Sequence, residues 1–304
     1  MSDFQCVIWK VEHGSAAFLR TPNDRTIMFD AGCSDDFSPA VYLNQTYGLN
    51  SYNKRLDRLI LSHPDRDHIR DIPNVHNLLD PRRFTRNHSI PEKVIYPSGT
   101  TELQEPLKTY KSMIERYRYE IGDYNKHLPV SNWGNVLVET FCCEPRHIPN
   151  CPESKLKNNL SLVSYVGYLD TEIVFPGDLE PYGWKSLLEN TNIRDYVGRA
   201  ECRILVASHH GRKSGIRYKV DGKEYIYTDF LELMQPNLVI ISDKWGNETT
   251  DPEAYRPHCT WYPVISRNTN QIQSKEILTT KTNEFILITV SSSRGDTTPV
   301  VKVP

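Results

Sequence analysis

The sequence lacks any apolar run long enough to span a membrane, and no basic segment followed by an apolar stretch stands at its N-terminus. A membrane-spanning helix needs about 20 consecutive apolar residues, and a secretory signal places a basic segment before its apolar core. We therefore predict a protein that does not enter a membrane and that resides in the cytoplasm.

The chain also carries little net charge and has no paired cysteine motif. The 36 Lys and Arg residues nearly balance the 38 Asp and Glu residues, so the formal charge is -2. The whole chain therefore has no basic field that would indicate nucleic-acid binding, although a locally basic groove is enough for it. The seven cysteines include the neighbours Cys142 and Cys143 but no C-x-x-C pair. This pattern is typical of reduced, buried thiols in a cytosolic protein.

Internal repeats, low-complexity tracts and linkers are absent as well, and we predict a single domain over residues 1–304 with a helical insertion around residues 80–130. Strands are expected in both halves with helices between them, which favours a layered α/β domain. The expected strands are 6–11, 16–20, 26–30, 57–62, 136–142, 160–168, 172–175, 203–207, 238–242 and 285–290; the expected helices are 71–79, 102–125, 184–189 and 230–235.

The strongest motif follows the fourth expected strand and reads Ser62-His63-Pro64-Asp65-Arg66-Asp67-His68. It packs four potential metal ligands into six residues. Imidazole and carboxylate together suit zinc, manganese or iron. Because successive side chains of a loop point in different directions, one short segment can supply ligands to two neighbouring ions.

Two further motifs also follow expected strands. Pro176-Gly177-Asp178 on its own is also typical of an ordinary turn. Ser208-His209-His210-Gly211 is more specific, because paired histidines at the end of a buried strand are uncommon. The three motifs together place histidines and carboxylates after three separate strands.

In this order the motifs resemble those of the metallo-β-lactamase-fold hydrolases, which carry H-x-H-x-D-H, then a bridging aspartate, then a late histidine. Asp65 stands where most members have the second histidine, and this H-x-D-x-D-H variant resembles the ComEC-like subgroup. Further similarities to that subgroup lie at Val11-Glu12-His13-Gly14-Ser15-Ala16, Phe29-Asp30-Ala31-Gly32, Asn158-Asn159-Leu160-Ser161-Leu162-Val163 and Pro236-Asn237-Leu238-Val239-Ile240-Ile241-Ser242.

The resemblance implies a four-layer αββα sandwich that holds two divalent metal ions, zinc or manganese. His63 and Asp65 would bind one ion, Asp67 and His68 the other, and Asp178 would bridge them. His209 or His210, together with Asp251, would complete the site. Asp67, His209 and His210 are the expected catalytic residues, and whichever of the two histidines is not a ligand would protonate the leaving oxygen. Asp30 and Asp57 are candidates to orient ligand imidazoles.

The chain departs from the family pattern at two ligands. The subgroup's later His-Pro is replaced by Asp251-Pro252, with His258 seven residues beyond, so either side chain is a candidate for the last ligand. His147 is a loose match to the histidine that most members carry before the bridging aspartate. Asn158 or Asn159 is an alternative near the metals, and we expect Asn159 to contact substrate.

Two locally basic segments point to a phosphate substrate. One spans residues 81–88, and the other, 212–219, begins with Arg212 and Lys213 directly after the His-His-Gly motif. Cations interleaved with aromatic rings suit a phosphodiester backbone with stacked bases. We therefore predict a nuclease or phosphodiesterase acting on DNA or RNA. A small-molecule phosphoesterase, of the nucleotide or phosphorylcholine type, and an effector subunit activated by a protein partner in a larger complex are the alternatives.

Overall fold

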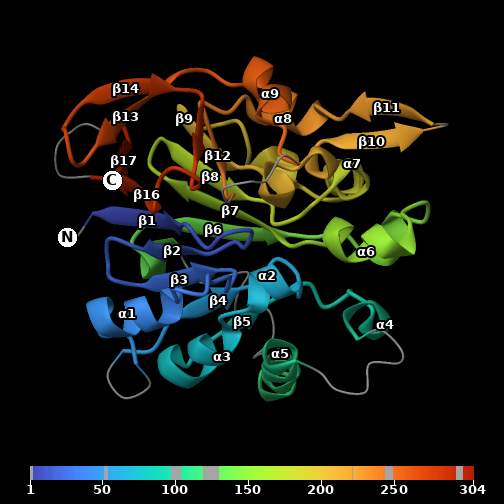
Figure 1. Ribbon diagram of the computed structural model, residues 1–304, viewed down its shortest axis with the longest axis horizontal. Coiled ribbons are helices and arrows are strands. Elements are labelled where there is room, and N and C mark those ends of the chain that lie inside the picture. Colours follow the sequence, from blue (N-terminus) through green and yellow to red (C-terminus); the bar gives the residue numbers. More distant parts are fainter. Residues whose placement is uncertain are drawn as a thin grey trace.

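Two β-sheets packed face to face form the centre of the protein, and helices cover their outer faces (Figure 1). The structure is a computed structural model that describes residues 3–50, 54–96, 104–118, 130–220, 222–243, 249–291 and 297–304. This arrangement is the four-layer αββα sandwich of the metallo-β-lactamase fold, which confirms the fold class predicted from the sequence.

The first sheet has nine strands among the described residues, in the order β14-β13-β17-β16-β1-β2-β3-β4-β5. Its N-terminal strands pair antiparallel from β1 to β3, whereas β3, β4 and β5 run parallel. The strands are β1 (Phe4–Trp9), β2 (Ala17–Arg20), β3 (Thr26–Phe29), β4 (Arg58–Ile60), β5 (Phe84–Thr85), β13 (Tyr262–Ser266), β14 (Ile272–Lys275), β16 (Phe285–Val290) and β17 (Val300–Val303).

The second sheet has six strands within the described ranges, in the order β15-β12-β9-β8-β7-β6. Its strands β8, β9, β12 and β15 are parallel, and β8 and β12 are buried along their whole length. Such continuous burial is expected of parallel strands with both faces covered. The strands are β6 (Leu137–Phe141), β7 (Val163–Tyr168), β8 (Thr171–Phe175), β9 (Cys202–Val206), β12 (Leu238–Ile241) and β15 (Ile277–Thr279).

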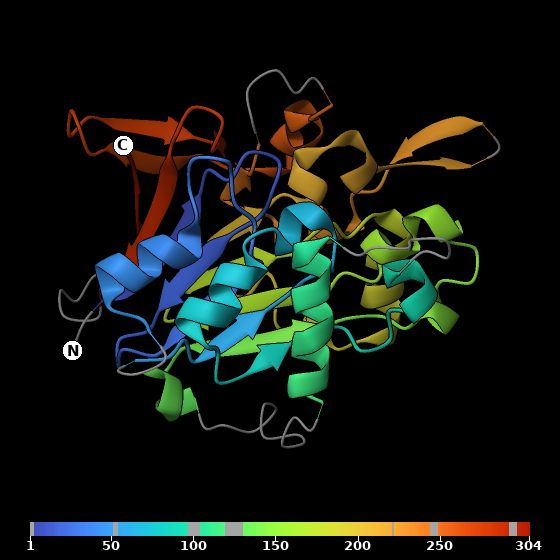
Figure 2. The ribbon, with the colours of Figure 1, turned by 60° about the horizontal axis from the view of Figure 1, so that its bottom comes forward.

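Three apolar clusters hold the layers together. The largest lies between the two sheets, where Phe29 stacks on Phe175 with ring centroids 4.4 Å apart. The second packs α1 (Pro39–Tyr47), α3 (Ile72–Asn74) and α5 (Glu105–Arg116) against the nine-stranded sheet, and the third packs α7 (Pro181–Asn190), α8 (Asp229–Met234) and α9 (Pro252–Tyr255) against the six-stranded sheet (Figure 2). The shorter helices are α2 (Arg66–Ile69), α4 (Glu92–Ile95) and α6 (Glu153–Asn159). No helix of the described residues has both the length and the apolar character that a membrane crossing requires.

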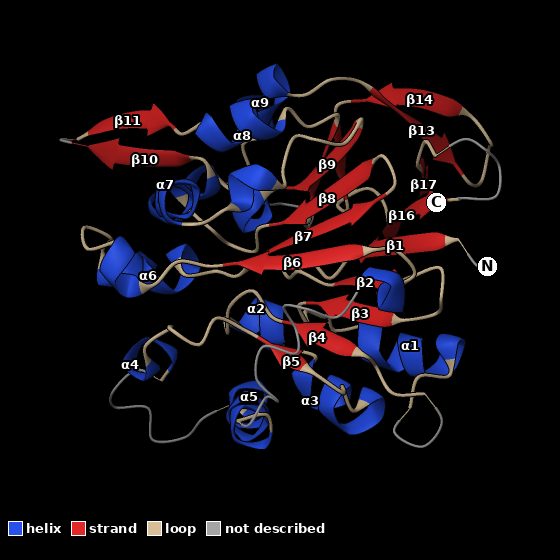
Figure 3. Ribbon diagram, turned by 180° about the vertical axis from the view of Figure 1, so that it is seen from behind, coloured by secondary structure: helices blue, strands red, loops and turns tan. Residues whose placement is uncertain are grey.

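Each of the ten expected strands has an observed counterpart, with ends that differ by a few residues. The helix expected over residues 102–125 is observed as α5, which buries Tyr110 and Met113 beside Phe84 of β5, while residues 119–129 lie outside the described residues. A hairpin of β10 (Arg217–Val220) and β11 (Lys223–Ile226) was not expected, and it projects beside α7 and α8 (Figure 3).

The parallel strands bring the three sequence motifs to one edge of the sandwich. The segment 62–68 follows β4, Asp178 follows β8, and the segment 208–211 follows β9. Since parallel strands end at the same edge of a sheet, side chains in the loops beyond them lie side by side. This edge carries the candidate metal centre.

Candidate metal centre

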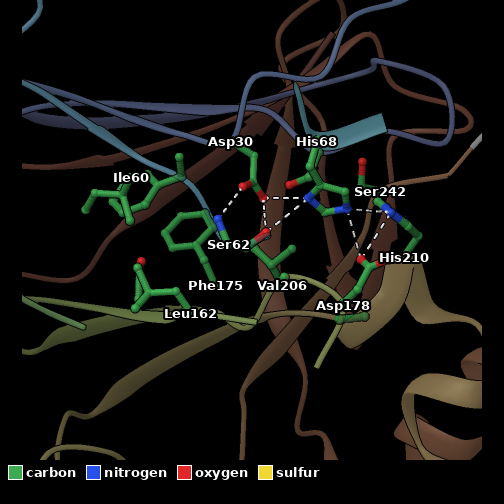
Figure 4. A pocket seen from close by; sticks show the side chains of 15 residues that line it. Asp30, Ile60, Ser62, His68, Leu162, Phe175, Asp178, Val206, His210 and Ser242 are labelled. Atoms are coloured by element: carbon green, nitrogen blue, oxygen red, sulfur yellow. Dashed lines mark hydrogen bonds and ion pairs between the residues drawn. The ribbon is translucent and has the colours of Figure 1, made fainter. Parts of the chain in front are cut away.

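Asp178 lies at the middle of a buried cluster of histidines. Its Oδ1 is 3.0 Å from His68 Nε2 and 3.3 Å from His210 Nε2, and its Oδ2 is 3.4 Å from His209 Nε2 and 3.7 Å from His63 Nε2. Figure 4 shows the Asp178 carboxylate facing the rings of His68 and His210. One carboxylate thus reaches imidazoles from both sheets, as the bridging position predicted for Asp178 requires.

The donor atoms of this cluster suit a divalent metal ion. His68 Nε2 and His210 Nε2 face each other at 3.1 Å, and His210 Nε2 is 3.4 Å from Asp67 Oδ2. The buried His63 Nε2 has no hydrogen-bond partner in the described part of the chain. Two groups of three side chains have donor atoms close enough to hold an ion: His63, His68 and Asp178, and Asp67, His68 and His210. Convergent, poorly satisfied imidazole nitrogens beside carboxylates are expected of a metal site.

The backbone around the paired histidines is strained. His209 has φ +49° and His210 φ +55°, and Gly211 follows with φ +72°. Residues other than glycine rarely adopt this left-handed region, and such strain concentrates at functional sites. The bend turns both rings toward Asp178. The strained backbone after β9 thus places two imidazoles in the site.

Asp30 orients the ring of His68 from the Nδ1 side, opposite the Nε2 that faces Asp178. The Asp30 carboxylate accepts from Ser62 N at 2.7 Å and lies 2.8 Å from His68 Nδ1 (Figure 4). With its Nδ1 held by a carboxylate, His68 presents Nε2 to the centre of the site. Asp57 does not share this role, because its carboxylate accepts from Thr26 N at 2.9 Å and pairs with Arg25, which joins β3 to the start of β4.

We expect Asp30→Asn to lower metal affinity about 10- to 100-fold, the usual effect of losing a carboxylate that orients a ligand histidine. Competition with a chromophoric chelator measures this affinity directly. Asp57→Asn is the matched control, and its effect is expected on thermal stability alone. Equal metal affinities for the Asp30→Asn protein and its parent would contradict the orienting role.

Without a metal, the carboxylates and histidines of the cluster shift the pKa of one another toward the charged form. Burial alone would raise the pKa of Asp178, but the histidines around it, His210 foremost, hold the pKa well below its usual range. Burial alone would lower the pKa of His68, but Asp178 and Asp30 raise it well above its ordinary value. Burial would also raise the pKa of Asp67, yet the hydrogen bond to His210 and nearby imidazoles lower it to about 2. The carboxylates are therefore ionised at neutral pH and ready to bind a cation.

Two lysines of α6 reach the edges of the cluster, which sequence reasoning missed. Lys157 forms an ion pair with Asp65, whose other oxygen is 3.4 Å from His63 Nε2. Lys155 lies 3.0 Å from Glu180, a buried carboxylate 3.3 Å from His209 Nδ1. Glu180 stands two residues after Asp178, so its position in the sequence was a usable signal. The lysines could not be found in this way, because α6 meets the site only through tertiary packing.

Several predicted site residues lie outside the cluster. Asn159 is fully buried, and its side chain donates to Lys155 O and accepts from Gly183 N. The second bond joins α6 to α7, so the side chain predicted to contact substrate has a structural role instead. Asp251 lies 2.6 Å from Arg217 Nε, and the ligand groups found within the described ranges include neither Asp251 nor His258.

The remaining candidates lie beside the cluster. His147 ends a short turn, Pro145–His147, and lines a separate cavity with Tyr182 of α7. Arg212 and Lys213 directly follow the His-His-Gly turn; Arg212 is half-buried and Lys213 is exposed. They add positive charge directly after the histidines.

The two packed sheets, the outer helices and the histidine–aspartate cluster at the strand ends define the metallo-β-lactamase fold class. A family model for the metallo-β-lactamase superfamily matches residues 9–133. Members of the superfamily are generally metal-dependent hydrolases that bind divalent ions. No curated protein matches the sequence.

Solved structures similar to the chain share little sequence with it. The metallo-β-lactamase-fold protein YhfI from Bacillus subtilis is 10% identical, with 84% of this chain and 91% of that chain covered and a TM-score of 0.40. The hydrolase AbOPH is 14% identical, with 70% and 78% covered and a TM-score of 0.35. A diphosphatase of the PhnP family is 10% identical, with 75% and 73% covered and a TM-score of 0.33.

Proposed function

We propose that this protein is a two-metal hydrolase of phosphoesters, a nuclease or phosphodiesterase that acts on DNA or RNA in the cytoplasm. The observation that carries the proposal is the convergence of four histidines from both sheets on the single carboxylate of Asp178. Two overlapping groups of ligands around one carboxylate suit a pair of neighbouring ions better than a single one.

We assign the candidate ligands to two ions. His63 and Asp65 would hold one ion, and Asp67, His68 and His210 the other, with Asp178 between them. Asp65 in place of an imidazole makes the first position richer in oxygen, which shifts the preference from zinc toward manganese. When bound, the ions would supply a water of lowered pKa and a clamp for phosphoryl oxygens.

His209 is the best candidate to deliver a proton to the leaving oxygen. It belongs to neither ligand group of the described residues, and its side chain is 12% exposed against 1% for His210. Ser214 Oγ at 2.8 Å and Glu180 at 3.3 Å hold its Nδ1. Nε2 is thereby directed to the centre, where a general acid must stand.

Positive charge around the centre supports a phosphate substrate. Lys155 and Lys157 contact carboxylates of the site, and Arg212 and Lys213 follow His210. The hairpin β10–β11 extends this charge with the exposed side chains of Lys219 and Lys223. A chain of phosphates suits such an extended basic border better than one small ester does.

We expect the protein to cleave single- or double-stranded DNA or RNA when manganese or zinc is added, and Asp67→Ala to lower the rate more than about 100-fold through loss of a ligand. Gel assays with labelled strands measure cleavage, and elemental analysis measures bound metal. Asp195→Ala, at a carboxylate that is 70% exposed, is the matched control and should retain full activity.

The alternatives predict different results in the same assay. Turnover of chromogenic diesters without cleavage of long strands would support a small-molecule phosphoesterase. Two bound metals without any turnover would support an effector that needs a protein partner. A parent protein that binds no divalent metal would contradict the proposal altogether.

A further inference from the structure

A second cavity lies between the turn after β6, α7 and the hairpin β10–β11. Its volume is about 340 Å³, within the range of about 300–1,000 Å³ that is usual for small-ligand pockets. Figures 1 and 3 both place the hairpin next to α7. Three tyrosines and five other polar side chains line it: Tyr182, Tyr218, Tyr227, His147, Asn150, Lys185, Ser186 and Glu189.

Both walls of the cavity are continuous with the metal centre. Pro181 and Tyr182 directly follow Glu180, which lies 3.3 Å from His209 Nδ1. The hairpin wall begins a few residues after Ser214, whose hydroxyl is 2.8 Å from the same nitrogen. The two segments that hold His209 Nδ1 therefore continue directly into the walls of this cavity.

The tyrosines offer accessible aromatic surface at fixed positions. Tyr182, Tyr218 and Tyr227 are each half-buried. Tyr218 meets Tyr227 edge to face with centroids 6.4 Å apart and packs on Tyr225 at 5.6 Å, so contacts on two sides fix its ring. Rigid, partly exposed tyrosines are the side chains on which nucleobases stack.

The polar groups of the cavity favour a nucleobase over a purely apolar ligand. Asn150 carries both amide donors and an amide acceptor, and His147 Nδ1 is buried without a hydrogen-bond partner among the residues that the structure describes. Lys185 adds an exposed cation. An aliphatic ligand would leave these groups unsatisfied, whereas the edge of a nucleobase supplies both donors and acceptors.

We propose that this cavity binds the nucleobase of the nucleotide whose phosphate lies at the metal centre. The inference rests on the proposed phosphoesterase function and makes it more specific, since the substrate is then a nucleotide unit rather than any phosphodiester. It also gives the hairpin a role, because Tyr218 and the end of the hairpin at Tyr227 form one wall of the base site.

Calorimetric titration of the zinc-loaded full chain with AMP and with ribose 5-phosphate tests the inference without turnover. AMP carries adenine where ribose 5-phosphate has only the anomeric hydroxyl, and stacking on aromatic side chains predicts that AMP binds about tenfold more tightly. Tyr218→Ala should remove most of this difference and leave ribose 5-phosphate binding unchanged, whereas Tyr218→Phe should keep it. Tyr42→Ala is the matched control, since Tyr42 is 39% exposed on α1 at the outer face of the other sheet.

Failure of this inference and failure of the proposed function give different results. Cleavage of phosphodiesters with equal affinity for the two probes would overturn the base site and leave the hydrolase intact. Tighter binding of AMP that depends on Tyr218, in a protein that cleaves no phosphodiester, would support the base site and contradict the hydrolase. Preference for AMP that survives in Tyr218→Ala would place the base elsewhere and overturn the inference.

Discussion

Asp178→Asn is expected to lower both metal affinity and hydrolysis by more than about 100-fold, because no other carboxylate of the described residues contacts so many histidines. The side chain is 3% exposed and lies within 3.7 Å of four imidazoles. Asparagine keeps the shape and one oxygen but removes the charge that would balance two cations. Elemental analysis after dialysis, together with cleavage rates in added manganese, measures the two effects separately.

The control for this variant must remove a charge without touching the cluster. Asp195→Asn does so at an exposed carboxylate whose ion pair with Arg199 spans 3.8 Å. A thermal-shift titration with zinc gives a further readout, since a metal that binds only the folded state raises the melting temperature. The parent and the control should show this rise, and Asp178→Asn should show little of it. Retention of two metals by Asp178→Asn would show that the carboxylate does not bridge them.

The sequence predicted the part of the site that depends on strand ends. His63, Asp67 and His68 share one loop, and their neighbours Asp178 and His210 follow parallel strands that end at the same edge. The period and length of the apolar runs reveal such strands, and polar residues directly after them are visible in the sequence. The order of the four layers, by contrast, was predicted from the resemblance of the motifs to those of the metallo-β-lactamase-fold hydrolases.

Residues that reach the site through packing could not be predicted in this way. Lys157 contacts Asp65 because α6 lies beside the loop after β4, and nothing in the spacing of the sequence places that helix there. Asn159 looked like a substrate contact in the motif, yet it is buried between α6 and α7. Asp251 was proposed from its place in the chain order, and it lies 2.6 Å from Arg217 instead. Motif spacing thus indicates which strand ends share one edge, but it does not indicate which helices or side chains pack against that edge.

Gly177→Ala is expected to lower the free energy of unfolding by about 2–5 kcal/mol and to weaken metal binding with it. Gly177 has φ +58°, where a side chain costs about 1–2 kcal/mol. A Cβ there would lie 2.4 Å from the Cβ of Ser62, and overpacking adds about 1–3 kcal/mol. Ser62 cannot move freely, because its backbone N–H donates to Asp30 at 2.7 Å. The clash would therefore displace the loop that carries His63 and His68.

A second glycine separates the two contributions. Gly48 has φ +62°, but an added Cβ would meet nothing within 4 Å. Gly48→Ala thus carries the backbone cost alone, and urea unfolding should place it about 1–2 kcal/mol below the parent with metal affinity unchanged. Adding Ser62→Gly to Gly177→Ala removes the atoms that clash and should recover part of the lost stability, although the Ser62 hydroxyl bonds are lost. Equal stabilities for Gly177→Ala and Gly48→Ala would show that the loops after β4 and β8 can separate, and the close approach of the two sheets would then not be what positions the metal ligands.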